Sequence, residues 1–372
     1  MLVTLLVAFL TSFSTALFLV LTSRWHRHLT SDTPGSGPQK LHDRATPRIG
    51  GLAVMAGFAL AVVVARVQLT VDTGANAPPW LTGWLVLALF VPFAAGMIED
   101  ITKSFGARAR LLATFVGAAI AYFFCNATLS RFALPPLDAL LALSPVAQFV
   151  LTLFCVGAIA NAYNLADGLN GLLAGLSVSA CAAMGWVAWQ HGDQFLTVST
   201  LSLAAAVAGF ALFNFPRARL FAGDGGAYLL GTAISLFAIL LVHRHADVSP
   251  WFAFALVLYP FVDTTAAIVR RLVAGRPIME PDADHLHTLL AQRLTERLGG
   301  SGRNIASAII VVVSATAAGL AIWLHQQTAL LVALCGLLVA AFAVAYMGVR
   351  RTPSQHPGSS PHQLDAKAVD PK

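Results

Sequence analysis

Long apolar stretches alternate with short polar loops along nearly the whole chain. An α-helix needs roughly 20 apolar residues to cross about 30 Å of hydrocarbon, and these stretches have that length. The pattern predicts an all-α polytopic integral membrane protein. It places eleven spans near residues 2–22, 49–67, 80–98, 110–125, 145–163, 171–190, 194–213, 226–242, 249–268, 305–324 and 328–347.

The amino-acid composition agrees with this pattern. Of the 372 residues, 57% are hydrophobic and 11% are charged, whereas about 25% are charged in soluble domains. The cysteines fall inside predicted spans without metal-ligand spacing, so we expect small packing residues there; they are Cys125, Cys155, Cys181 and Cys335. Residues 1–347 form one predicted membrane domain. Residues 348–372, rich in Pro, Ser, Gly and His, are predicted to be a disordered cytoplasmic tail.

The basic residues separate by loop. Of the 23 Lys and Arg residues, only Arg66, Arg131 and Arg244 fall in or beside one set of alternate loops, and the rest fall in the other set. Basic residues in short loops stay in the cytoplasm, which predicts an external N-terminus and a cytoplasmic C-terminus. The net charge of +6 reflects this bias and indicates no nucleic-acid partner. A cleaved signal peptide is the alternative for residues 1–22, but no basic residue precedes the apolar core.

Polar clusters lie at the predicted cytoplasmic ends of the spans. They are Glu99-Asp100, the segment from Asn161 to Gly171, the segment from Phe221 to Gly226, and the segment from Asp284 to His287. Charged and amide groups near the hydrocarbon region are costly and are typical of functional sites. Because all four clusters are predicted on one face, we expect them to converge on one cleft.

The segment 161–171 contains three asparagines, Asp167 and two glycines between apolar runs. In a continuous helix Asn161 and Asn170 would lie on opposite faces. Gly168 and Gly171 are therefore predicted to end the helix and to free backbone amides beside Asp167, which suits phosphate and metal binding. A polar helix end with a glycine cap is the structural alternative, which we favour for a single residue and not for the whole set.

Asp224 lies in a Gly-Asp-Gly-Gly sequence at the start of a predicted span. A carboxylate there can simply complement the helix dipole. Its hard oxygen atoms also suit Mg²⁺, and the neighbouring glycines would let a phosphate approach the backbone. Asn214 and Phe221 belong to the same loop, and the ring of Phe221 either packs in the core or stacks on a nucleobase.

His285 and His287 follow acidic residues and lack the spacing of a zinc site. Basic residues lie upstream at Arg270, Arg271 and Arg276. The imidazoles are therefore expected to bind a pyrophosphate or a sugar, with a solvated structural pair as the alternative. For Asp263 the sequence favours an ion pair with Arg270 or Arg271 over a ligand role.

Taken together, these motifs resemble the polyprenyl-phosphate N-acetylhexosamine-1-phosphate transferases, glycosyltransferase family 4. This group includes undecaprenyl-phosphate N-acetylglucosamine-1-phosphate transferase and phospho-N-acetylmuramoyl-pentapeptide transferase. The resemblance covers roughly residues 1–347 and rests on Pro47 to Gly51, Asn161 to Leu172 and Phe221 to Gly226. The His-Leu-His element and the eleven spans resemble the N-acetylglucosamine branch.

The resemblance implies transfer of a HexNAc-1-phosphate from a UDP-sugar to undecaprenyl phosphate, with release of UMP, in the bacterial cytoplasmic membrane. Mg²⁺ is the implied cofactor, with Mn²⁺ as an alternative. The expected roles are catalysis for Asp100, Glu99 and Asp167, metal binding for Asp224 and Asn164, nucleotide binding for Asn170, Asn214, Phe221 and Asp167, and sugar or pyrophosphate binding for His285, His287 and Arg271. Lys103 is expected to attract the lipid phosphate.

The acceptor phosphate has a second pKa of roughly 6 and is largely a dianion at neutral pH. We therefore expect direct in-line attack on the sugar-bearing phosphorus, with Asp100 orienting or deprotonating the acceptor. The chain departs from the common family pattern at Glu99, where an Asp is usual, at Asn170, where an Asp is usual, and at Thr288, where a further His is usual.

Two other function classes compete with this interpretation. A transporter or lipid-carrier flippase would also have many spans and intramembrane polar groups, but such proteins tend to contain inverted repeats and midplane sites. A catalytically inactive family member is the second alternative, suggested by Glu99, Asn170 and Thr288. The sequence leaves open whether the donor carries GlcNAc, GalNAc or a 6-deoxy amino sugar, which envelope polysaccharide is initiated, and whether the protein is a homodimer.

Overall fold

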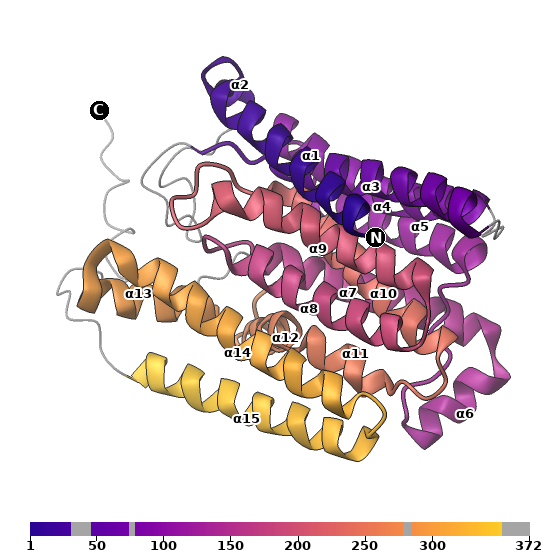
Figure 1. Cartoon of the computed structure of the whole chain (residues 1–372). Coiled ribbons are helices and arrows are strands. Elements are labelled where there is room, and N and C mark those ends of the chain that lie inside the picture. Colours follow the sequence, from indigo (N-terminus) through magenta and orange to yellow (C-terminus); the bar gives the residue numbers. More distant parts are fainter. Residues whose placement is uncertain (31–45, 74–78, 278–283, 352–372) are drawn as a thin grey trace, which may run out of the picture.

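The computed structural model describes residues 1–30, 46–73, 79–277 and 284–351, and within these ranges it contains helices and no β-strand (Figure 1). Residues 348–351 of the predicted tail belong to helix α15, so the predicted start of the tail is wrong, and residues 352–372 lie outside the described residues. The helices are α1 (Leu2–Leu21), α2 (Ser23–Thr30), α3 (Gly51–Thr73), α4 (Pro79–Thr102), α5 (Ala107–Cys125), α6 (Pro135–Leu143), α7 (Pro145–Ala166), α8 (Leu172–Gln190), α9 (Gln194–Asn214), α10 (Gly223–Arg244), α11 (Pro250–Leu256), α12 (Leu258–Val273), α13 (Leu286–Leu298), α14 (Gly302–Leu324) and α15 (Thr328–Arg351), with a short 3₁₀ turn at Gly299–Ser301.

Ten helices among the described residues are long and apolar enough to span a membrane, which confirms a multi-pass membrane protein. The predicted span 249–268 differs from the others, because it is broken into α11 and α12, which meet at an angle of 73°. Pro260 explains the break: it has no N–H to donate to the carbonyl of Leu256, where α11 ends. The count reaches the predicted eleven only if this bent pair is one span.

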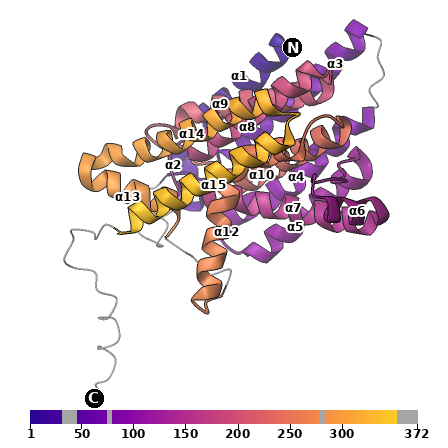
Figure 2. The ribbon, with the colours of Figure 1, turned by 90° about the horizontal axis from the view of Figure 1, so that it is seen from below.

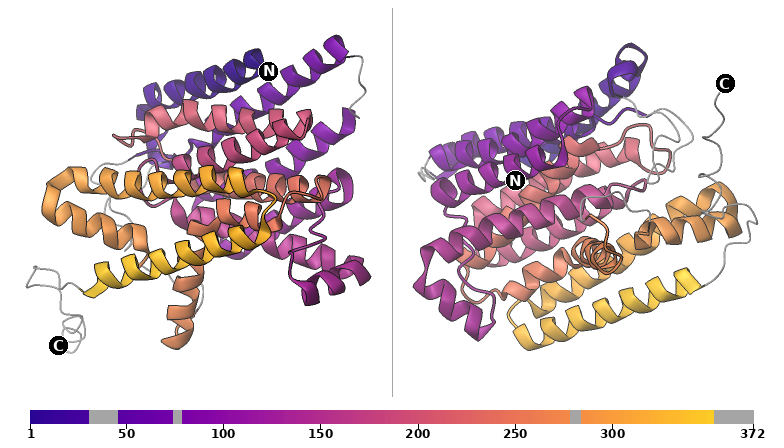
Figure 3. Two further views of the ribbon diagram at one scale, coloured as in Figure 1. Left: turned by 60° about the horizontal axis from the view of Figure 1, so that its bottom comes forward. Right: turned by 180° about the vertical axis from the view of Figure 1, so that it is seen from behind.

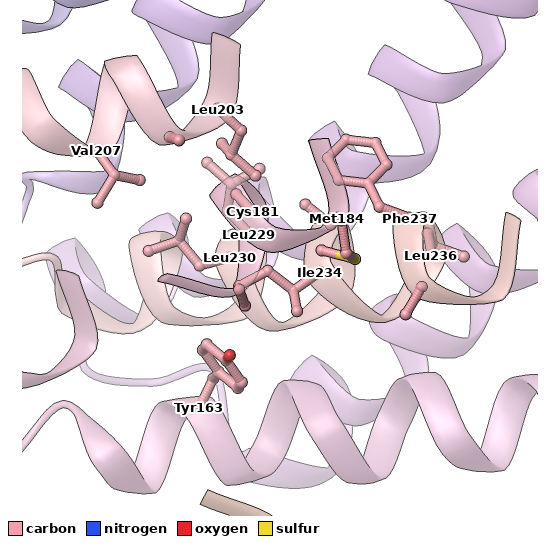
Figure 4. Close-up of a cluster of buried hydrophobic side chains, with 14 of the residues drawn as sticks. Tyr163, Cys181, Met184, Leu203, Val207, Leu229, Leu230, Ile234, Leu236 and Phe237 are labelled. Carbon is pink, nitrogen blue, oxygen red and sulfur yellow. The ribbon is translucent and has the colours of Figure 1, made fainter. Parts of the chain in front are cut away.

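Helix α10 lies at the centre of the bundle. Its apolar window is completely buried, although it has the length and hydropathy of a membrane span. Side chains of α10 meet those of α7, α8 and α9 in one apolar cluster (Figure 4), which includes Leu229, Leu230, Ile234 and Phe237 of α10 with Tyr163, Cys181, Met184, Leu203 and Val207. The cysteines lie within helices as expected: Cys125, Cys181 and Cys335 are buried, and Cys155 is partly buried.

Small residues let α10 approach its neighbours closely. A Cβ atom added to Gly231 would lie 2.6 Å from the Cα atom of Ala160 on α7. At the start of α10, a Cβ atom on Gly96 of α4 would lie 2.5 Å from the backbone nitrogen of Gly225. Such contacts are typical of membrane bundles, where van der Waals packing rather than the hydrophobic effect holds helices together.

The two ends of the bundle differ in the elements that they carry. Helices α13 and α6 lie at opposite ends, and α12 leaves the bundle at a steep angle (Figures 2 and 3). At the end with α6, the Arg131 guanidinium donates to the carbonyls of Val242, His245 and Val248 at 2.7–3.0 Å. This contact satisfies carbonyl groups at and beyond the C-terminus of α10.

A buried carboxylate stabilises the same end. Asp193 is the N-cap of α9 and accepts a hydrogen bond from the Leu196 N–H at 3.0 Å. Its second oxygen lies 2.7 Å from Arg244 Nε and 3.0 Å from His245 Nε2. The charged groups here are thus engaged in holding helix ends together.

We predict that Gly231→Ala destabilises the protein by about 1–3 kcal/mol, because the added methyl group would overlap the backbone of α7. Gly319→Ala in α14 is the matched control, since a Cβ atom there meets nothing within 4 Å. Thermal unfolding in detergent measures both variants. Equal melting temperatures for the two would contradict the tight packing of α7 against α10.

Candidate active site

The segment before α3 is hydrogen-bonded along the segment before α10. Phe221 N–H donates to the carbonyl of Pro47 at 2.9 Å, and Gly50 N–H donates to the carbonyl of Phe221 at 2.8 Å. Gly51 N–H donates to the carbonyl of Ala222 at 2.9 Å. These bonds bring together two sequence motifs that are far apart in the chain: Gly50 and Phe221 are separated by 171 positions.

Asp100, near the C-terminal end of α4, caps the N-terminus of α10. Its two carboxylate oxygens accept hydrogen bonds from the N–H groups of Asp224 at 3.0 Å and Gly225 at 2.9 Å, and the residue is completely buried. The first N–H groups of a helix lack intrahelical partners and attract negative charge. Asp100 therefore fixes the position of Asp224.

Two arginines contact the Asp224 carboxylate. Arg48 Nη2 donates to one oxygen at 2.8 Å, and Arg110 Nη1 pairs with the other. Arg48 Nε also lies 3.9 Å from Asp100 Oδ1. The site therefore combines two carboxylates with two guanidinium groups, a set that can hold phosphate oxygens and their counter-ions.

Gly223 lies in close contact with the backbone of Arg48 and the carboxylate of Asp100. Its φ angle is +71°, in the left-handed region that favours glycine. An added Cβ atom would overlap the carbonyl oxygen of Arg48 and lie 2.5 Å from Asp100 Oδ2. Glycine is thus the residue that both the backbone conformation and the available space allow here.

Asp167 follows the last residue of α7 and lies beside the same groups. Burial raises the pKa of its carboxyl to about 7; Arg48 and the Gly223 N–H lower the pKa, and Asp100 raises it. Asp167 is therefore close enough to Asp100 and Arg48 to interact with both. The convergence of all four clusters on one cleft stays a prediction. Asn164 lies on the last turn of α7, and its backbone carbonyl accepts from the Asp167 N–H at 3.4 Å.

The donor set suits a hard cation. Across the described part of the chain, no three Asp, Glu, His or Cys side chains are grouped so that they could enclose a metal ion by themselves. Mg²⁺ does not need such a cage, because one or two carboxylates, water and substrate phosphates commonly complete its octahedron. Asp224 already faces two cationic groups. Its shared role with Asn164 as a metal ligand stays a prediction.

The predicted nucleotide residues link the loops around the site. Asn214 is buried: its Oδ1 accepts from the Gly171 N–H at 2.7 Å, and its Nδ2 donates to the carbonyl of Leu220 at 3.0 Å. Asn170 Nδ2 donates to the Pro216 carbonyl and to Asn304 Oδ1, both at 3.2 Å. Their contacts with a nucleotide stay predictions.

Phe221, the predicted stacking residue, is packed in the protein. Only 6% of the residue is exposed, and its backbone is held by Pro47 and Gly50. A nucleobase contact would require more of the ring surface to be uncovered.

The histidine pair is buried and is held by a third acid. His285 Nδ1 lies 2.8 Å from Asp263 Oδ2, and His287 Nδ1 lies 3.5 Å from the same oxygen. The expected pairing of Asp263 with Arg270 or Arg271 is therefore wrong. Those arginines are close in sequence, but α12 presents the carboxylate to the start of α13. Arg271 itself is buried.

Glu99 lies in the last turn of α4, and Lys103 directly follows that helix. Glu99 Oε2 accepts from the Phe105 N–H at 2.7 Å, so the carboxylate stabilises the turn after α4. Lys103 is exposed and has a φ angle of +54°. The proposed catalytic and lipid-phosphate roles of the two residues stay predictions.

No site role was predicted for Arg48, Asp263 or Asn304. Arg48 lies in the Pro47 to Gly51 motif, next to conformationally free glycines, and that position was an available signal. No sequence signal indicated that Arg48 pairs with Asp224, because 176 positions separate the two residues.

Comparisons with known proteins identify the family of the chain. The family model for glycosyl transferase family 4 matches residues 82–242, which include Asp100, Asp167 and Asp224. A probable undecaprenyl-phosphate N-acetylglucosaminyl 1-phosphate transferase of Bacillus subtilis (strain 168) is 31% identical over 262 residues, covering 70% of each chain.

Two further relatives have similar names. A decaprenyl-phosphate N-acetylglucosaminephosphotransferase of Mycolicibacterium smegmatis is 34% identical over 285 residues, covering 68% of this chain and 66% of the relative. An undecaprenyl-phosphate alpha-N-acetylglucosaminyl 1-phosphate transferase of Escherichia coli (strain K12) is 28% identical over 262 residues, covering 68% and 67%. The chain therefore belongs to glycosyl transferase family 4, in agreement with its motifs.

Proposed function

We propose that this protein is a phosphotransferase that moves GlcNAc-1-phosphate, or a related HexNAc-1-phosphate, from a UDP-sugar to undecaprenyl phosphate and releases UMP. The observation that carries the proposal is the meeting of Asp100, Asp167 and Asp224 around Arg48 at one end of the bundle. The relatives named for transfer to a polyprenyl phosphate support the same reaction class.

The chemistry requires positioning more than covalent help. The acceptor phosphate, with a second pKa of roughly 6, is already a nucleophilic dianion at neutral pH. Phosphoryl transfer then depends on alignment and on positive charge near the transferred group. Arg48 and Arg110 supply fixed positive charge, and Asp100 holds the start of α10 in place.

Mg²⁺ is the proposed cofactor. When bound, it would neutralise charge on the donor pyrophosphate, with Asp224 and Asn164 as the residues that would hold it. The oxygen-rich donor set supports this choice, because Mg²⁺ prefers carboxylate and amide oxygens. Arg48 and Arg110 would remain beside the phosphates as additional cationic groups.

The proposed orientation places the site in the cytoplasm of a bacterium, at the inner membrane. Ser249, just before α11, is hydrogen-bonded to His325 at one end of the bundle, whereas Asp263 of α12 contacts His285 near the site. The bent pair therefore connects both ends. If α11 and α12 form one span, the chain crosses the membrane eleven times, and the predicted basic loops at the site end then favour an external N-terminus and a cytoplasmic C-terminus.

A transporter or flippase would need its polar groups at a central site with access from both sides. Here Asp100 and Asp224 gather with Arg48 and Arg110 at one end of the bundle, whereas Asp193 and Arg244 hold helix termini at the other end. The fully buried α10 passes through the middle. This distribution favours the transferase.

We predict that purified protein catalyses exchange of labelled UMP into UDP-GlcNAc, and transfer to undecaprenyl phosphate, only with a divalent cation. A panel of radiolabelled UDP-sugars, scored by the lipid product, identifies the donor. EDTA is expected to abolish both reactions and added Mg²⁺ to restore them. A protein that exchanges UMP with none of the common UDP-HexNAc donors would contradict the proposed function.

We predict that Asp100→Asn lowers kcat about 100-fold or more, because its NH2 group would replace one of the two accepting oxygens and face a backbone N–H, so that Asp224 would shift. Activity measured from pH 6 to about 9 is expected to stay low, whereas recovery at high pH would identify Asp100 as a base. Asp138→Asn is the matched control. The Asp138 carboxylate likewise accepts two backbone N–H groups, at 2.6 and 3.1 Å, but at the other end of the bundle.

We predict that Asp167→Asn stabilises the metal-free protein more at pH 8 than at pH 5. The pKa of Asp167 is about 7 in the folded protein, against a usual value of 3.8. Folding therefore favours the protonated acid, and stability falls as the pH rises between these values. The expected difference between the two pH values is about 2–3 kcal/mol. Thermal unfolding in EDTA measures it, and an equal effect at both pH values would contradict the assignment.

A further inference from the structure

One buried carboxylate organises the whole His285-Leu286-His287 element. Asp263 Oδ2 lies 2.8 Å from His285 Nδ1 and 3.5 Å from His287 Nδ1. Its other oxygen accepts from the Leu286 N–H at 2.9 Å. Asp263 is 3% exposed, so these contacts form away from solvent.

The two rings are held in a defined arrangement. They are stacked, with centroids 5.3 Å apart and an interplanar angle of 17°. The hydroxyl of Tyr259 adds a contact of 3.3 Å to His287 Nδ1. Both histidines are almost completely buried, so their rings have little freedom to turn.

The histidine element touches the segment that carries Asp167. A Cβ atom added to Gly168 would lie 2.8 Å from His287 Nε2 and 3.3 Å from its Cδ2 atom. The ring of His287 therefore lies directly against the backbone next to Asp167. Through this contact, Asp263 on α12 is connected to the proposed donor site.

One ring nitrogen has no partner. His285 Nε2 is buried and makes no hydrogen bond with any residue that the structure describes. A buried polar atom without a partner is costly, and functional sites are a common reason for such an atom. Because Asp263 engages Nδ1, Nε2 is the atom that remains for a ligand.

We propose that Asp263 is a positioning residue of the transfer reaction, which fixes the rings of His285 and His287 so that Nε2 of His285 meets an oxygen atom of the sugar phosphate of the donor. This inference rests on the proposed function, and it adds a residue that does not touch the substrate. A carboxylate bound to one ring nitrogen sets the orientation of a histidine and of its other nitrogen.

The test is a double-mutant cycle with Asp263→Asn, His285→Ala and the combined variant in the full-length protein. Asp263→Asn is expected to raise the KM for UDP-GlcNAc about tenfold, as loss of a buried polar contact would. Inhibition by UMP is expected to change by less than about twofold, because UMP lacks the sugar phosphate. If Asp263 acts through His285, the double variant is no worse than His285→Ala.

Asp193→Asn is the matched control, since Asp193 is also buried and paired with a histidine, at the other end of the bundle. It is expected to lower the melting temperature without changing KM. Should Asp263→Asn not fold, Asp263→Glu takes its place. Glu keeps the charge but displaces the carboxylate, so a smaller selective rise in KM is expected.

Three outcomes would overturn the inference. They are additive effects of Asp263→Asn and His285→Ala, an equal loss of affinity for UMP and UDP-GlcNAc, and an unchanged KM in a folded variant. Failure of the proposed function gives a different result, because the wild-type protein would then neither bind UDP-sugars nor form a lipid product.

Discussion

The bond between the Asp100 carboxylate and the start of α10 is the contact on which the site depends. Helix α10 is buried along its apolar length, so its first N–H groups need a partner from the protein. Asp100 supplies it to Asp224 and Gly225. The approach of α4 at Gly96 makes the bond possible, and Gly223 leaves room for the carboxylate. Asp224 is thereby directed toward Arg48 and Arg110.

Charge in this protein is concentrated where it can be compensated. The middle of the bundle is filled by apolar side chains, and the interacting acids and bases lie at helix ends. At the end with α6, Asp193 and Arg131 serve the helix termini. At the other end the partners of Asp224 are arginines, which can also contact phosphate groups. A buried charge needs a partner at both ends of the bundle. At the end with α6 these pairs stabilise helix termini, and at the other end they form the candidate active site.

Hydropathy predicted most of the fold, because a span must be long and apolar in any membrane helix. It missed the break between α11 and α12, since the composition there stays apolar and only Pro260 signals it. The clusters of the site were visible as polar residues at span ends, but their partners were not. Asp263 was assigned to nearby arginines, whereas its partner His285 lies 22 positions further along the chain. Sequence proximity is therefore a poor guide to the partner of a buried carboxylate.

The structure also gives physical reasons for two departures from the common family pattern. Asn170 donates through Nδ2 to the carbonyl of Pro216 and to Asn304. An aspartate there could only accept, and it would face the Pro216 carbonyl with a like partial charge. Glu99 reaches the Phe105 N–H across the turn after α4, a contact that its longer side chain permits. Both residues therefore serve the loops around the site, while Asp100, Asp167 and Asp224 keep their carboxylates. These departures change hydrogen bonds in the loops around the site and leave its three carboxylates in place. This favours an active transferase over an inactive relative.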